Sequence, residues 1–562
     1  MRREVSVVNK KVCSFPILFA LLALVIGTCA VVFPASAQAA PTSTGSITVS
    51  GTVARSYDAY QIFSANVVDG DNDAKIATDL AWASDAVRDA ALPLLHSAGM
   101  SKSQTTAQEA AEWLNTDSHL TSALSAQLAL SLQSSGAVSV ALNAGTTAEL
   151  PCGYWLIVAD DDAISQNEAG TAPIMALVGG SAVTVKPKAA TPKVAKHVME
   201  DSTAAWQKAA DATVADDLYW RLSATVPAGL TAYDTYTVRF VDTMSAGLDP
   251  SKVAASMRVY VAAGADGDFD AVPTGGDGRA GTEPAKGWTD ITAQCATKVA
   301  ADGTFTVRTG DLIAALGGAD AFTAGARVVA VYDAPLNSAC SHGIAKGNPN
   351  EVYLRYPRSP LADQSGDAGF TRTPSDDACA YTWDLALTKR GNDGDKPLAG
   401  AVLSIADDRG RTLTADGTWD AEGKATVTTG EDGRVTVSGV DSGKLEVREL
   451  KAPKGYTAFE GTRSVTVKAE GLDVDQVAAA KPKLTITAES PLRADSADGS
   501  TGSLEVSLIN SPAGRPPSIF TGGFMPSTGD MAMYAAAAAA VAGAALIVVA
   551  LLVKRGGGSH KE

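Results

Sequence analysis

The side chains that usually carry catalysis are few in this chain and lie far apart. The sequence contains no HExxH pattern, no phosphate-binding glycine loop and no nucleophile elbow. Four histidines precede the C-terminal tail, and each is isolated: His96, His119, His197 and His342. We therefore expect no enzyme that acts on an external substrate, and a hydrolase is disfavoured.

Two acidic turns faintly resemble calcium-binding loops. They are Asp69–Asp73 and Asp266–Asp270, and each is followed by Ala where an EF-hand loop needs Gly. Ordinary solvated turns account for them better. We expect no cofactor and no metal centre, and leave calcium binding open and unassigned.

The net charge of −16 excludes a basic nucleic-acid footprint. A soluble, mutually repelling surface is the simplest interpretation of this acidity. We expect no nucleic-acid partner.

The N-terminus has the pattern of a secretory signal peptide. Arg2, Arg3, Lys10 and Lys11 precede an apolar run from Phe15 to Phe33, and small residues follow it. We place the signal peptide at residues 1–39, so the rest of the chain is expected to be exported.

Four cysteines remain after the signal peptide: Cys152, Cys295, Cys340 and Cys379. An even number in an exported chain suits disulfides, and the sequence leaves three full pairings open. Cys340 with Cys379 is the preferred pair, because both flank one presumed strand.

The C-terminus combines a short motif with a membrane-length apolar run. Met531–Val553 carries no charge and is long enough to span a bilayer, and Lys554 and Arg555 follow it. The preceding pentapeptide Met525-Pro526-Ser527-Thr528-Gly529 resembles the LPXTG cell-wall sorting signal of Gram-positive surface proteins. That resemblance implies that a sortase cleaves after Thr528 and joins its carboxyl group to an amine, so membrane retention is transient.

Strand and turn patterns dominate the rest of the chain. Alternating segments begin at 46–66 and resume after Val138, and between them we expect helices at 79–96, 105–114 and 120–132. Regular short strands favour a mainly β fold of tandem immunoglobulin-like sandwiches, with helices added to the first domain. The expected parts are an N-terminal domain at 40–186, a linker at 187–193, a middle domain at 194–378, a third domain at 379–515 and a stalk with the sorting signal, transmembrane segment and basic tail at 516–562.

The third domain carries the most specific motifs. Leu385–Lys389 opens it, Glu449–Tyr456 reads E-L-K-A-P-K-G-Y, and Val506–Asn510 closes it. In order and spacing these resemble the Cna B-type domain. The resemblance implies an isopeptide bond between Lys389 and Asn510, assisted by Glu449.

Such a bond needs each of these residue types. A lysine amine attacks only when neutral, and burial disfavours its charged form. A protonated carboxyl group can activate the carboxamide of asparagine. Contact among the three groups makes the attack effectively intramolecular, which is worth roughly 7–11 kcal/mol of the barrier.

The middle domain resembles the middle, Cna A-like domain of backbone pilins. The motifs are Pro192–Val198, Phe240–Leu248 and Gly347–Leu354, and they imply Lys196 as the isopeptide lysine and Asp242 as its acid. The resemblance places the asparagine after the last strand, but Tyr356–Pro360 contains none. A disulfide involving Cys340 is an alternative clamp.

The linker resembles the pilin motif, in which a lysine follows V-x-V-Y-P. Val183–Lys188 reads V-T-V-K-P-K, so Lys188 matches that lysine, and Lys186 and Lys193 are alternatives. The implied role is to accept the Thr528 carboxyl group of the next subunit.

Together the motifs resemble a backbone pilin of the SpaA and FimA types. The implied function is a structural shaft subunit of a wall-anchored surface pilus that supports adhesion. Its implied partners are pilin-class and housekeeping sortases, copies of itself, peptidoglycan, and tip and base pilins; the host surface or glycan is unassigned. A monomeric wall-anchored adhesin, or an ancillary tip or base pilin that binds a host ligand, is the alternative.

Overall fold

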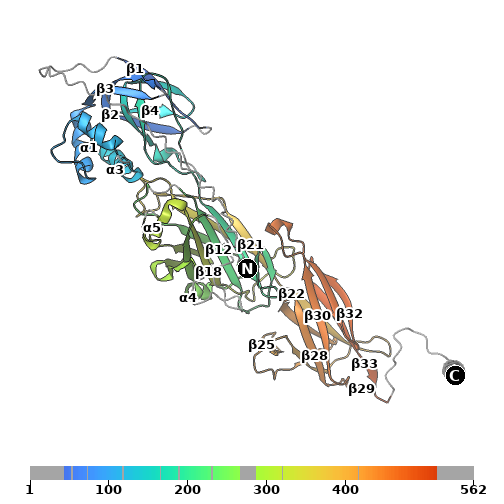
Figure 1. Cartoon of the computed structure of the whole chain (residues 1–562). Helices are drawn as coiled ribbons and strands as arrows, with labels where there is room; N and C mark the ends of the chain where they lie inside the picture. Colours follow the sequence, from blue (N-terminus) through green and yellow to red (C-terminus); the bar gives the residue numbers. More distant parts are fainter. Residues whose placement is uncertain are drawn as a thin grey trace, which may run out of the picture.

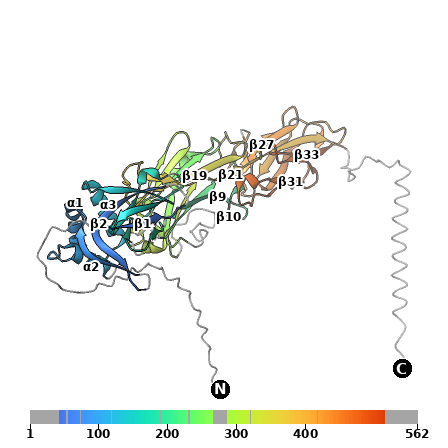
Figure 2. The same cartoon turned by 90° about the horizontal axis from the view of Figure 1, so that it is seen from above.

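Three β-rich bodies follow one another along an elongated molecule (Figures 1 and 2). The computed structural model describes residues 43–51, 55–71, 74–116, 119–164, 166–187, 190–228, 232–265, 286–318, 321–415 and 417–514. The predicted mainly β fold of tandem sandwich domains, with helices added to the first, is confirmed; the middle body also contains two short helices.

The N-terminal body, residues 44–185, packs two sheets with orders β5-β1-β8 and β3-β2-β6-β7, and β4 pairs with β2. Its elements are β1 (Thr44–Val49), β2 (Ser56–Asp69), β3 (Lys75–Trp82), α1 (Asp85–Ser97), α2 (Ala107–Asn115), α3 (Ser122–Ser134), β4 (Ser139–Asn143), β5 (Thr147–Pro151), β6 (Gly153–Ala159), β7 (Ile174–Val178) and β8 (Val183–Val185). The predicted helical insertion is therefore present between β3 and β4.

Capping side chains set the starts of the three helices. Ser84, Thr106 and Thr121 each accept a backbone N–H of the first turn, which satisfies a donor that would otherwise be unpaired. The first helix begins later than the predicted residue 79, because residues up to Trp82 pair with β2 as strand β3.

The middle body, residues 193–381, is a sandwich of two sheets. Their orders are β10-β9-β12-β18-β14-β15 and β11-β21-β19-β13-β17-β16, and β20 pairs with β19. The strands are β9 (Lys193–Glu200), β10 (Ala205–Gln207), β11 (Ala209–Asp211), β12 (Tyr219–Val226), β13 (Arg239–Met244), β14 (Arg258–Ala263), β15 (Thr289–Asp290), β16 (Ala296–Val299), β17 (Thr304–Arg308), β18 (Ala326–Asp333), β19 (Asn348–Pro357), β20 (Phe370–Arg372) and β21 (Asp376–Tyr381), with short helices α4 (Val253–Ser256) and α5 (Leu312–Ala315).

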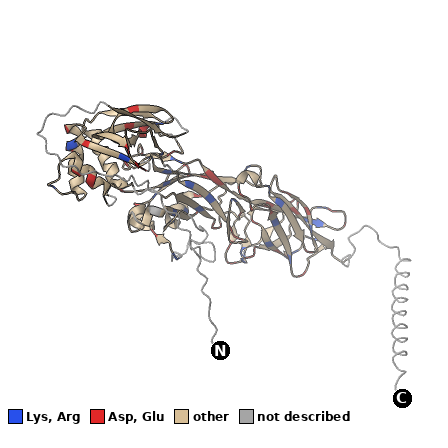
Figure 3. Ribbon diagram, turned by 45° about the horizontal axis from the view of Figure 1, so that its top comes forward, with Lys and Arg blue, Asp and Glu red and all other residues tan. Residues whose placement is uncertain are grey.

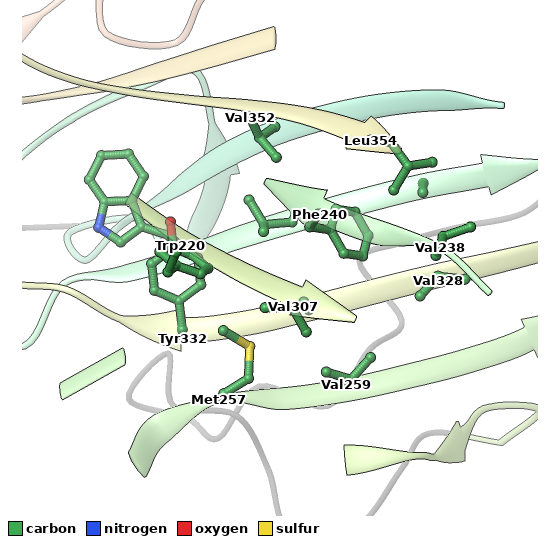
Figure 4. Packing of buried hydrophobic residues seen from close by; sticks show 14 of the residues in the cluster. Trp220, Val238, Phe240, Met257, Val259, Val307, Val328, Tyr332, Val352 and Leu354 are labelled. Carbon is green, nitrogen blue, oxygen red and sulfur yellow. The ribbon is translucent and has the colours of Figure 1, made fainter. Parts of the chain in front are cut away.

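Large apolar side chains fill the space between the two sheets of the middle body. Figure 4 shows Trp220, Phe240 and Tyr332 among the valines and leucines of this core, and all three are buried. Buried and more exposed residues alternate along β13, which places Phe240 inward, whereas β12 and β18 are buried on both faces. A polar group inside this core therefore needs a partner there.

The third body, residues 383–512, is a smaller sandwich. Its sheets run β27-β22-β33-β29, with β32 on β33, and β25-β24-β23-β28-β30-β31, with β26 on β23. The strands are β22 (Trp383–Gly391), β23 (Val402–Ala406), β24 (Thr412–Leu413), β25 (Trp419–Asp420), β26 (Val427–Thr428), β27 (Arg434–Val440), β28 (Gly443–Lys451), β29 (Tyr456–Thr457), β30 (Thr462–Glu470), β31 (Lys483–Ala488), β32 (Leu492–Asp498) and β33 (Ser503–Pro512). The first strand, β22, lies parallel to and directly beside the last, β33.

The preferred Cys340–Cys379 disulfide is not present. Both residues are free thiols, as are Cys152 and Cys295. Cys379 is buried in the core of the third body, whereas Cys340 packs against the core of the middle body, so the two side chains serve different cores. The predicted disulfide is therefore wrong: two cysteines that flank one strand in the sequence need not face each other in the fold.

Several predicted features lie outside the described residues: the signal peptide, Lys188, residues 72–73 of the first calcium-like loop and all of the second, the Met525–Gly529 motif and the apolar run after it. In the part of the chain that is described, no helix has the length and apolar character needed to cross a membrane. No cluster of His, Cys, Asp and Glu among those residues has the geometry to hold a metal ion.

Candidate functional site

Lys389 lies at the centre of a buried polar cluster in the third body. It is on β22, between the two sheets, and its side chain is fully buried. Its Nζ atom is 3.1 Å from Oε1 of Glu449, which comes from β28 of the facing sheet. Nζ makes no hydrogen bond of good geometry, so the amine lies near the carboxylate but does not donate a well-formed hydrogen bond to it.

Asn510 completes this cluster from the last strand. Its Nδ2 atom donates to both carboxylate oxygens of Glu449 at 2.9 Å, while its Oδ1 atom has no partner. The parallel register places Asn510 opposite Gly391, two residues beyond Lys389. Glu449 also accepts the backbone N–H of Phe459 at 3.1 Å, which fixes the carboxylate. The three side chains predicted from the motifs are therefore brought together.

Burial changes the acid–base behaviour of Lys389. Removal from water lowers the pKa of its ammonium to about 8, and the nearby Glu449 carboxylate opposes part of that effect. A substantial fraction of the amine is then neutral near pH 8, whereas an exposed lysine is almost entirely charged there. A neutral amine beside a carboxamide is the arrangement that amide formation needs.

A second buried cluster lies in the middle body. Lys196 on β9 and Asp242 on β13 are both fully buried and form an ion pair across the two sheets. The Nζ atom of Lys196 also donates to the hydroxyl of Tyr332 at 2.8 Å, and that hydroxyl donates to Asp242 at 3.2 Å. The predicted pair of Lys196 and Asp242 is therefore in contact.

Burial acts on both members of this pair. It lowers the pKa of Lys196 to about 8 and raises that of Asp242 to about 6, although each charge partly counteracts the effect on the other. The gap between the two pKa values is therefore much narrower than in water. Proton transfer from the ammonium to the carboxylate becomes correspondingly easier.

Asn350 is a buried neighbour of this pair that the motifs did not single out. It is fully buried on β19, and its Nδ2 atom donates to the Tyr332 hydroxyl at 2.9 Å. The family pattern places the asparagine at Tyr356–Pro360, where none occurs. The available signal was alternation, since Asn350 shares the inward face of β19 with Val352 and Leu354. An asparagine in such a row must have a buried partner.

The two clusters differ in which strands they would join. In the middle body, Lys196 and Asn350 belong to opposite sheets, so a bond between them would cross the sandwich. In the third body, Lys389 and Asn510 belong to neighbouring strands of one sheet.

The unpaired oxygen atoms are a further shared feature. Oδ1 of Asp242, Oδ1 of Asn350 and Oδ1 of Asn510 are buried and have no hydrogen-bond partner. Buried acceptors of this kind are costly, at about 1–3 kcal/mol each. In the third body, a proton on Glu449 could reach Oδ1 of Asn510 only after the amide turns over, because Nδ2 faces both carboxylate oxygens.

The structure describes two of the three linker lysines. Lys186 and Lys193 are exposed at the end of the N-terminal body and the start of β9, and Lys188 between them lies outside the described residues.

The fold and these clusters define a protein of tandem β-sandwiches with buried lysine–acid–asparagine sets. Residues 384–481 match the family model of the SpaA prealbumin-like fold domain. The chain is 29% identical to the trypsin-resistant surface T6 protein of Streptococcus pyogenes serotype M6 over 143 residues. These residues cover 24% of this chain and 24% of that protein. The chain thus spans about a quarter of the length of that curated relative.

Solved structures with a similar arrangement include two backbone pilins. The T6 backbone pilin of serotype M6 Streptococcus pyogenes is 16% identical with a TM-score of 0.45, covering 84% of this chain and 98% of that one. The major pilin SpaD of Corynebacterium diphtheriae is 16% identical with a TM-score of 0.41, covering 84% and 100%. The resemblance to backbone pilins stated from the motifs is confirmed.

Proposed function

We propose that this chain is the shaft subunit of a covalently polymerised pilus on the surface of a Gram-positive cell. The observation that carries the proposal is the pair of buried Lys–acid–Asn clusters, one in each of the two bodies that would bear load. We also propose the domain division predicted from the sequence, which agrees with separate cores in the middle and third bodies.

Each cluster is proposed to form one isopeptide bond without an external enzyme. The neutral amine of Lys389 attacks the side-chain carbonyl carbon of Asn510 while protonated Glu449 donates to the carbonyl oxygen. The new C–N bond forms, the bond to the Asn510 amide nitrogen breaks, and that nitrogen leaves as ammonia after taking up a proton. Glu449 can relay the proton from the attacking amine to this leaving group.

In the middle body, Lys196 and Asn350 would react in the same way with Asp242 as the acid. Tyr332 positions the groups, because its hydroxyl contacts all three side chains. The unpaired Oδ1 atoms of Asp242 and Asn350 support a protonated carboxyl group during the reaction.

Polymerisation is proposed to join Thr528 of one subunit to Lys188 of the next through a sortase. A subunit held at these two points carries tension from the linker, through the middle and third bodies, to the C-terminus. With both isopeptide bonds in place, covalent bonds bypass residues 197–349 and 390–509. Hydrogen bonds would otherwise carry that load, at only about 0.5–1.5 kcal/mol each.

The N-terminal body would lie outside this path of tension, because it precedes Lys188. Its described core contains no buried lysine, and its buried polar residues are only Ser125 and Thr171. The absence of a crosslinking cluster from this described core supports the proposed attachment point. Cell-wall anchoring through Met525–Gly529 and a role in adhesion are parts of the same proposal.

Substituting the linker lysines tests the proposal. In cells that express the full chain, Lys188→Ala should abolish the high-molecular-weight ladder on blots of wall extracts, while Lys186→Ala and Lys193→Ala retain it. A ladder that survives Lys188→Ala would contradict the shaft assignment at this residue. A monomeric adhesin predicts a single wall-attached species in all four strains.

A further inference from the structure

A row of arginines crosses the outer face of the middle body. Arg308, Arg239, Arg355 and Arg372 occupy directly opposite positions on β17, β13, β19 and β20. Neighbouring strands are about 4.8 Å apart, so the row extends about 14 Å. Elsewhere, acidic and basic residues are scattered along the chain (Figure 3).

The fold does not require this row. Like charges directly opposite on paired strands are destabilising, and the overall charge of the protein is −16. One acidic side chain partly compensates: Asp367 pairs with both Arg239 and Arg355 from the loop between β19 and β20. Arg372 is exposed, and its side chain makes a cation–π contact with Tyr353 at 5.0 Å.

A cavity of about 500 Å³ lies at the Arg372 end of the row, where the N-terminal body meets the middle body. Arg355, Arg358 and Arg372 line it together with Tyr353, Phe370 and Gln166, and none of its described lining residues is acidic. Arg358 is short of partners: its Nε atom is buried with none, and its nearest carboxylate oxygen, on Asp162, is 3.6 Å away.

We propose that this cavity binds a sugar that carries a carboxylate, at the end of an acidic glycan. Guanidinium groups bind carboxylates through paired hydrogen bonds. The size falls in the range of about 300–1,000 Å³ that is typical for small-molecule sites, far more than a single small anion fills. Tyr353 and Phe370 add apolar atoms to the lining, although Arg372 and Arg239 lie over their rings, and Gln166 offers hydrogen-bonding groups for the hydroxyls of the sugar.

Asp367 occupies the place that a ligand carboxylate could take farther along the row. Its carboxyl group is 70% exposed, and the two arginines lower its pKa. It therefore competes with an incoming anion for Arg355. If the chain polymerises as proposed above, each subunit repeats the site, and a weak single affinity becomes a strong multivalent one.

Calorimetric titration of the purified exported chain tests the site with 3′-sialyllactose, with lactose as the neutral control. We expect 3′-sialyllactose to bind and lactose not to bind. Arg372→Gln should weaken binding at least tenfold, and Asp367→Asn should strengthen it severalfold. Arg434→Gln removes an exposed arginine of the third body that pairs with Glu505, and it should leave the affinity within twofold of wild type.

Equal binding of lactose and 3′-sialyllactose, no binding of either, or an unchanged affinity in Arg372→Gln would overturn the site. Inorganic phosphate that competes as well as 3′-sialyllactose would also overturn it, in favour of a general anion or a phosphate-bearing wall polymer. None of these results depends on pilus assembly, so they are distinguishable from failure of the proposed function. Unchanged thermal unfolding of the exposed-site variants Arg372→Gln and Asp367→Asn shows that they are folded.

Discussion

Asn350 donates a hydrogen bond to the hydroxyl of Tyr332 at 2.9 Å, deep between the two sheets of the middle body. The same hydroxyl accepts a hydrogen bond from Lys196 at 2.8 Å. One phenol therefore holds an amine and a carboxamide from opposite sheets within reach of each other. The family pattern, applied by position alone, missed this relationship.

Substitutions of Asn350 test the bond in the middle body. In Asn350→Ala the crosslink to Lys196 cannot form, so the ammonia that the wild type loses is retained. After correction for the smaller side chain, the variant should therefore be heavier than the wild type by one ammonia. Loss of the link should also lower the free energy of unfolding by several kcal/mol, by analogy with a disulfide that closes a long loop. Intact-mass spectrometry and guanidinium unfolding measure the two effects.

Asn348 provides a matched control on the same strand. It is also buried, but its Nδ2 atom donates to the backbone oxygens of Ser341 and Ala380, away from Lys196. The Asn348→Ala variant should be less stable than the wild type, but it should still form the crosslink and lose one ammonia. If Asn350→Ala also kept that loss, Asn350 would not be the partner of Lys196.

Glu449→Gln tests the role of the acid in the third body. It preserves the shape of the side chain but removes the group that is proposed to transfer the proton. We predict a folded chain in which Lys389 and Asn510 remain unlinked, so one ammonia is retained. Lys444→Ala, on the exposed face of the same strand, should leave crosslinking unchanged. A fully crosslinked Glu449→Gln variant would contradict the mechanism.

Acid should strengthen the junction between the middle and third bodies. Burial and neighbouring carboxylates raise the pKa of Glu200 to about 7 and that of Asp441 well above its usual range. A carboxyl group whose pKa is higher in the folded state binds its proton more tightly there. The contribution of Glu200 to the free energy of unfolding is therefore fully present below its pKa in the unfolded chain, about 4.3, and is lost as pH rises towards 7.

Glu200→Gln isolates this effect, because the amide imitates the protonated acid. At pH 7 the variant should be more stable than the wild type, by about 1–3 kcal/mol, and at pH 4.5 that advantage should disappear. Glu446→Gln, at an exposed site, should show no such change. Guanidinium unfolding at the two pH values measures the difference, and an advantage that does not depend on pH would refute the assignment.

Pulling on single molecules tests the proposed path of tension. With the full exported chain held near the linker and at the C-terminus, the third body of the wild type should not extend, because residues 390–509 are bypassed. Lys389→Ala should add an unfolding event of that body. An identical event in the wild type would show that its first and last strands are not covalently joined.

Short motifs predicted much of this molecule. The third-body residues Lys389, Glu449 and Asn510 were found because the family pattern fixes both their types and their order, and the strands bring them into contact. The sandwich fold follows from alternation and turns, which are local properties of the sequence. Boundaries were less certain: residues up to Trp82 form a strand because β2 offers a partner, which a local pattern does not reveal.

Long-range packing explains what the sequence could not provide. Cys340 and Cys379 are close in the sequence pattern, but they pack into different cores. Tyr332 contacts Lys196, Asp242 and Asn350 only because β18, β9, β13 and β19 surround one interior. The arginine row likewise depends on the register of four strands.

The mass of the intact exported chain tests the central claim most directly. We predict that the purified chain is lighter than the mass calculated from its sequence by two molecules of ammonia. Tandem spectrometry should then find Lys389 joined to Asn510 and Lys196 joined to Asn350. A mass equal to the calculated value, with all four residues in unmodified linear peptides, would contradict it.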